Sequence, residues 1–166
     1  MGAEPAISFT ELLAYIEAEE RRWEEWFQRN PEALEVRVDI AEAATVGHLV
    51  CHIFGVASRT AERLLGHPMT ADERIDATSI ESLFGMGGGA RSKLRQFLGQ
   101  VNEDQISRPR QFQSATLGTF IASPRKLMTH AVMHGVRHWA QIATVLRQNG
   151  YPQDWPHDVI FTDGMV

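Results

Sequence analysis

The stretch SPRKLMTHAVMHGVRHWAQIATVLRQNG, residues 123–150, carries the clearest helix signal in the chain. Ser123 is a typical N-cap residue, and Pro124 suits the first helical position because the N–H of that position has no partner inside a helix. Gly150 suits a C-terminal cap, so the stretch predicts a helix over residues 124–149. Most of its non-histidine side chains are apolar, which indicates that the helix is packed in a core.

Three other stretches predict long helices, because each combines apolar residues at helical spacing with a start or stop signal. We expect these helices at residues 9–29, 39–65 and 79–100. The run from Gly85 to Gly89 predicts a break in the last one, since each glycine costs up to about 1 kcal/mol in a helix interior. A phosphate-binding loop is disfavoured there because no strand precedes the run and no Walker lysine follows it.

The sequence lacks a convincing strand or internal repeat, which favours an all-α protein. We predict one domain, residues 1–166, folded as a four-helix bundle with long inter-helix connections, residues 102–122 among them. The tail after Gly150 is expected to dock on the bundle. Its apolar residues are Tyr151, Trp155, Ile160 and Phe161.

Composition and charge narrow the classes of function. The net charge of −5 argues against nucleic-acid binding, which usually needs a basic patch. No window approaches the roughly 20 apolar residues of a membrane helix, and the first nine residues do not resemble a signal peptide. The single cysteine, Cys51, cannot form an internal disulfide, which suits a reducing compartment. We expect it to be a small buried apolar side chain. A cytoplasmic protein with neither a membrane nor a nucleic-acid partner is predicted.

Five of the seven histidines lie in two predicted helices at four-residue spacing, so neighbours in each series share a helical face. They are His48, His52, His130, His134 and His138. Each adjacent pair can bind one metal ion, but His130 and His138 lie about 12 Å apart along the axis and cannot share one. The spacing alone leaves open a solvated face with ordinary hydrogen bonds. Apolar neighbours favour an inward-facing, metal-binding arrangement, because a buried imidazole needs a partner.

The stretch from His134 to Gly150 resembles the C-terminal signature of the DinB family, the bacterial damage-inducible four-helix proteins. That signature reads roughly His-x-x-x-His-Arg-Gly-Gln-Ile, followed by leucines, an arginine and a closing glycine. An upstream His-Leu pattern that ends in Leu-Leu-Gly is similar to His48-Leu49 and Leu64-Leu65-Gly66. The chain departs from the signature at Trp139 and Ala140, where the family often has Arg-Gly, and retains Gln141.

The resemblance implies a divalent metal ion, zinc, nickel or iron, bound by His48, His134 and His138. It gives no place to His52 or His130, which are then outer-shell groups, an alternative ligand set or core residues. Three protein ligands leave a coordination position open, as in catalytic sites. The family's thiol chemistry implies a metal-dependent thiol S-transferase that acts on a small-molecule substrate with a low-molecular-weight thiol, and a homodimer.

Two alternatives remain at this point. One is a metal-binding stress-response protein without catalysis. The other is a metal-dependent hydrolase, which the scarcity of acidic residues beside the histidines disfavours because hydrolysis needs a general base. No catalytic residue is assigned from the sequence.

Overall fold

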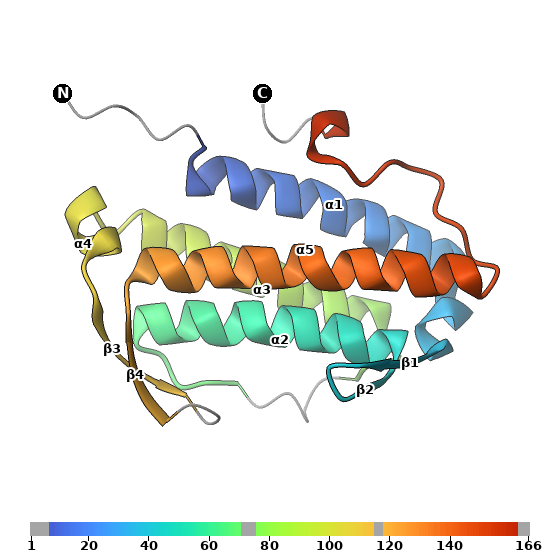
Figure 1. The fold of residues 1–166 in the computed structure, drawn as a ribbon, viewed down its shortest axis with the longest axis horizontal. Helices are drawn as coiled ribbons and strands as arrows, with labels where there is room; N and C mark the ends of the chain where they lie inside the picture. Colours follow the sequence, from blue (N-terminus) through green and yellow to red (C-terminus); the bar gives the residue numbers. More distant parts are fainter. Residues whose placement is uncertain (1–6, 71–75, 115–117, 163–166) are drawn as a thin grey trace.

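The computed structural model describes residues 7–70, 76–114 and 118–162, and these are mostly helical. Four long helices run side by side in Figure 1. They are α1 (Phe9–Arg29), α2 (Val46–Leu65), α3 (Ile80–Leu98) and α5 (Pro124–Gln148). Helix α2 packs against α3 and α5, and α1 packs against the same two helices from the other side. This architecture agrees with the predicted all-α class.

The helix ends follow the capping signals of the sequence. Ser8 and Glu11 form the reciprocal capping box of α1, in which each side chain bonds the other residue's backbone N–H. Ser123 accepts a hydrogen bond from the backbone of Lys126 and starts α5. Gly66, with a φ of 71°, ends α2 in the left-handed conformation that glycine adopts at little cost. The predictions for α1, α3 and α5 therefore hold to within two residues.

The prediction that the chain contains no strand was wrong, because the described residues include two antiparallel hairpins. Strands β1 (Arg37–Ile40) and β2 (Ala43–Thr45) occupy the region where the second helix was predicted to begin. Ala41 and Glu42 make their turn with φ values of 52° and 64°, as a two-residue hairpin requires. The hairpin was not predicted because the sequence lacks the Asn-Gly pair that marks such turns. Because the hairpin occupies residues 37–45, α2 begins at Val46 and not at residue 39.

The second hairpin lies within the predicted connection 102–122. Helix α4 (Glu103–Ser107) is followed by β3 (Arg110–Ser114) and β4 (Gly118–Ala122), which pair in regular register. In Figure 1 this hairpin lies at the end of the helices where α2 finishes and α5 begins.

The predicted break at the glycine run was also wrong, because α3 continues through it. Gly87 lies against the buried ring of Phe54 on α2. A Cβ atom at this position would lie 2.5 Å from Phe54 Cε1, closer than packed atoms come. Close packing of the two helices thus needs glycine at this position, and tertiary contact offsets its poor helix propensity.

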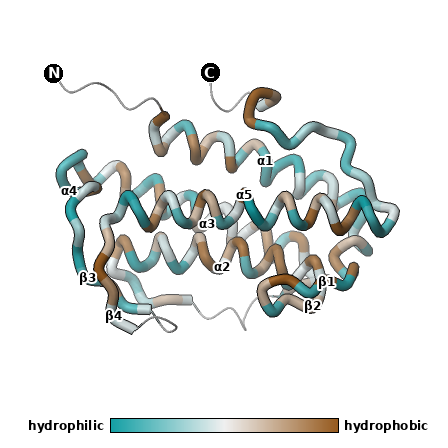
Figure 2. Tube along the Cα trace, in the orientation of Figure 1, coloured by the Kyte–Doolittle hydropathy of each residue, from teal (hydrophilic) through white to brown (hydrophobic). Residues whose placement is uncertain are grey.

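The core joins all four long helices, and Figure 2 shows hydrophobic and hydrophilic residues alternating along them. Cys51 is buried in it, as predicted. So are three aromatic residues of α1, Trp23, Trp26 and Phe27. In the tail, Tyr151 and Trp155 pack against this core, and Trp155 Nε1 donates a hydrogen bond to Glu19. Ile160 and Phe161 are 84% and 55% exposed, so of the four apolar tail residues only Tyr151 and Trp155 pack against this core.

Among the described helices, none combines the length and apolar character needed to cross a membrane. Residues 1–6, which contain most of the segment considered for a signal peptide, lie outside the described part of the chain.

Candidate metal centre

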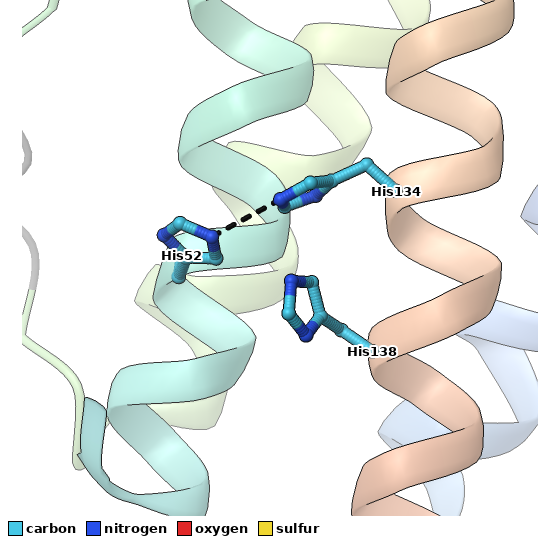
Figure 3. Close-up of side chains that lie close together, drawn as sticks. All are labelled: His52, His134 and His138. Atoms are coloured by element: carbon cyan, nitrogen blue, oxygen red, sulfur yellow. Dashed lines mark hydrogen bonds between the residues drawn. The ribbon is translucent and has the colours of Figure 1, made fainter. Parts of the chain in front are cut away.

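Helices α2 and α5 bring three histidines together between them. His52 comes from α2, while His134 and His138 come from successive turns of α5. One ring nitrogen from each side chain lies within 4.8 Å of the other two. Figure 3 shows the three imidazole rings turned toward one another across the space between the two helices. Within the described residues, this is the group whose spacing suits a metal ion.

The distances within the group are close to those of shared ligands. The Nε2 atoms of His52 and His134 lie 3.1 Å apart. Two nitrogens bound at about 2.0–2.1 Å to one tetrahedral ion lie roughly 3.3 Å apart. The ring centroids of His134 and His138 are 4.4 Å apart, and those of His52 and His138 are 5.2 Å apart. Since the nitrogens of the whole group lie within 4.8 Å of one another, the rings must draw together by up to about 1.5 Å to share one ion.

Burial keeps the two α5 imidazoles neutral, the form that binds metals. His134 is 8% exposed and His138 is 3% exposed. Burial, with the nearby rings and Arg137, lowers the pKa of His134 from 6.5 to about 3. Burial also lowers the pKa of His138, although its hydrogen bond to Gln141 acts in the opposite direction. At neutral pH both rings offer a lone pair.

Gln141 sets the orientation of His138. The Nδ1 atom of His138 lies 2.7 Å from Gln141 Oε1, which accepts a hydrogen bond from an N–H at that position. The proton on Nδ1 leaves Nε2 with the lone pair, as in metal-binding histidines held by an outer hydrogen bond. Arg137 Nη2 donates a hydrogen bond of 3.3 Å to that Nε2 and places a positive charge beside the centre, so an ion bound at Nε2 displaces this donor.

His134 turns one ring nitrogen, Nε2, toward His52 and leaves the other without a partner. Its Nδ1 atom is buried and has no hydrogen-bond partner among the described residues. A buried polar atom without a partner is costly, and such atoms are rare in folded proteins. The donor set, made only of imidazoles, suits zinc, nickel or iron better than magnesium or calcium. The residues therefore fit a transition-metal ion.

The structure places the remaining histidines outside this group. His48, predicted as the third ligand, is exposed in the first turn of α2, where its Nδ1 lies 2.9 Å from Oγ1 of the N-cap residue Thr45. His130 is also exposed, and its ring centroid lies 5.6 Å from that of His134. His52, for which the sequence left open an outer-shell, ligand or core role, lies beside His134 and His138, where the resemblance implied His48. The N-cap signal at Thr45 was the available clue, because it puts His48 in the helix's first turn.

A cavity of about 630 Å³ lies beside His52, which is itself half-buried. His48 and Cys51 line it from α2, and Glu42 and Asp76 line it from the neighbouring segments. A small molecule in this cavity, which we call the α2 cavity, reaches one edge of the histidine group.

Comparison with known proteins gives a match to a protein family and a similar protein from a bacterium. The sequence profile of the DinB family matches residues 4–162, which is most of the chain. The relative is protein DinB of Bacillus subtilis (strain 168), 24% identical over 115 residues. The aligned region covers 64% of this chain and 66% of that protein, just under two thirds of the relative's length.

Proposed function

The chain belongs to the DinB family, and from that premise we propose that it binds one divalent metal ion through His52, His134 and His138 for thiol-transfer catalysis. The observation that carries this proposal is the set of three imidazole nitrogens within 4.8 Å of one another. Zinc, nickel and iron all suit three nitrogen ligands. We also assign the four long helices to a four-helix bundle, the fold that resemblance to the family implies.

Three protein ligands leave room for a small molecule at the ion, which is the arrangement of catalytic sites and not of structural ones. When bound, a divalent ion lowers the pKa of a coordinated thiol and so supplies a thiolate at neutral pH. The thiolate is the nucleophilic form, and its transfer to an electrophile is the reaction that we propose.

The chain's own groups orient and shield this centre. Gln141 holds His138 in one tautomer, and burial of His134 and His138 excludes water from the α5 side. The guanidinium group of Arg137 beside His138 favours the thiolate form of the cosubstrate over the neutral thiol by simple charge attraction. The half-buried His52 and the α2 cavity give the cosubstrate its path to the ion.

The proposed partners are small molecules, a low-molecular-weight thiol and an electrophile. A homodimer in the cytoplasm completes the proposal. The homodimer rests on family resemblance, and the cytoplasmic location rests on the single, buried cysteine.

The test compares metal-loaded and chelator-treated protein in conjugating a small thiol, such as cysteine or glutathione, to 1-chloro-2,4-dinitrobenzene. We expect faster conjugation with metal-loaded wild type than with chelated protein or the metal-treated His52→Ala variant. Equal rates with and without metal would contradict catalysis through the ion. Tight metal binding with no reaction across a panel of thiols and electrophiles would favour the non-catalytic metal-binding class.

A metal-dependent hydrolase is a second candidate because the α2 cavity contains acidic residues as well as His52. Asp76 accepts hydrogen bonds from the backbone and side chain of Thr78, so Glu42 is the better candidate for a general base. Hydrolysis of activated esters by metal-loaded protein, lost in Glu42→Gln while metal content is unchanged, would support this candidate. Absence of hydrolysis across ester and amide substrates would remove it.

A further inference from the structure

A second cavity lies on the other side of the histidine centre, toward the C-terminal end of α2. It measures about 530 Å³ and lies between α2, the start of α5 and the β3–β4 hairpin. Val56 and His130 line it, and each is one turn along its helix from a proposed ligand, His52 and His134 respectively. We call this cavity the basic pocket.

Positive charge dominates the basic pocket. Its charged or titratable lining residues are Arg59, Arg63, Lys126 and His130, and no aspartate or glutamate is among the described residues that line it. The α2 cavity differs, because Glu42 and Asp76 line it. The two cavities that flank the histidine centre thus have opposite charge, which favours different chemical groups in each.

Arg63 is held in place within this pocket. It is half-buried, and its Nε donates a hydrogen bond of 2.7 Å to the backbone carbonyl of Gln113 on β3. Burial and the nearby Arg59 lower the pKa of Arg63, although an arginine stays charged at neutral pH. An anion in the pocket can pair with the guanidinium group of Arg63, which lines it. Lys126, on the exposed face of α5, adds a further positive charge at the rim.

The pocket also has an apolar wall. Phe120 and Ile121 contribute it from β4 and Leu127 from α5. Ile121 is 74% exposed, so its side chain is accessible to a molecule bound in the pocket. Cations beside an apolar wall suit a molecule that carries an anionic group on an apolar body.

We propose that the basic pocket binds a small organic anion, a carboxylate attached to an apolar group, and holds it next to the histidine centre. The role of this anion as a reactant rests on the proposed function, whereas its binding to the pocket does not require a metal ion. The pocket then selects one of the two reactants by charge, and the α2 cavity receives the other.

The experiment uses full-length ¹⁵N-labelled protein, treated with chelator, and titrated with naphthalene-2-carboxylate while amide resonances are followed by NMR. Naphthalene-2-carboxamide is the neutral control probe. We expect the carboxylate to shift resonances of α2 after Val56 and of β4, and to bind more tightly than the amide. Binding should weaken as salt is raised, because salt screens exposed charges.

The matched variants are Lys126→Glu and Arg147→Glu, which reverse one exposed charge each on the same helix. Arg147 lies 21 residues along α5 from Lys126, about 31 Å away. We expect Lys126→Glu to weaken carboxylate binding by about tenfold and to leave amide binding unchanged, whereas Arg147→Glu changes neither. Equal affinity for the two probes, no binding, or equal effects of both variants would overturn the proposal. Because the protein is metal-free, failure of the metal site does not alter this result.

Discussion

Acidification should destabilise the metal-free protein through His134, whose burial lowers its pKa to about 3. In the unfolded chain the same side chain has a pKa of about 6.5. As the pH falls below 6.5, the unfolded chain binds a proton that the folded protein does not bind until the pH approaches 3. The unfolding free energy therefore falls by about 1.4 kcal/mol per pH unit in this window, or about 2 kcal/mol between pH 6.5 and 5.

Urea unfolding of chelator-treated protein, followed by circular dichroism at pH 7, 6 and 5, measures this effect. The comparison is with His134→Gln, which removes the titrating group and keeps a polar side chain of similar size. We expect the wild type to lose about 2 kcal/mol more than the variant between pH 7 and pH 5. The lowered pKa of His138 acts in the same direction in both proteins and largely cancels. Identical pH dependence of the two proteins would refute the reasoning.

Two further substitutions test the packing of α3 against α2 and the orientation of His138. Gly87→Ala should destabilise the fold by about 1–3 kcal/mol in thermal or urea unfolding, because the added methyl group meets the ring of Phe54. Gly85→Ala is the control: its added methyl group lies in open space, so it should stabilise the fold slightly. Stabilisation by both changes would contradict the close contact. Gln141→Ala removes the group that orients His138 and should weaken metal binding by about 10–100-fold in a competition titration with a chromogenic chelator. Unchanged affinity would show that this hydrogen bond does not position the ring.

Capping residues and apolar spacing predict most of the helical fold, since both act within a few residues of sequence. Ser8 with Glu11 and Ser123 with Pro124 start α1 and α5 where the sequence indicates. Continuity of α3 could not be predicted in this way. It depends on the contact between Gly87 and a helix more than 20 residues earlier in the chain, which local propensity does not contain.

The short hairpins escaped prediction for a different reason. Strands of three to five residues carry little alternation, and the turn at Ala41 and Glu42 uses residues that rarely adopt positive φ. Since that hairpin replaces the first turns of the predicted helix, it also fixes where α2 begins.

The start of α2 decides which histidine faces α5. His48 and His52 share one helical face but lie about 6 Å apart along the axis, so spacing alone does not distinguish them. Thr45 caps the helix and places His48 in its first turn, and His52 then lies level with His134 and His138. Spacing predicts that neighbouring histidines of α5 lie on one face, and the structure places His52 beside His134 and His138, where the family resemblance implied His48.

The central claim is that His52, with His134 and His138, binds one metal ion, and metal analysis of untagged protein tests it most directly. Each variant is purified alongside wild type, exposed to zinc, and desalted before the bound metal is measured per chain. We predict one ion per chain in wild type and in His48→Ala, and loss of stoichiometric metal in His52→Ala and in His134→Ala. A His52→Ala protein that keeps its ion while His48→Ala loses it would contradict the account and restore the ligand set implied by the family resemblance.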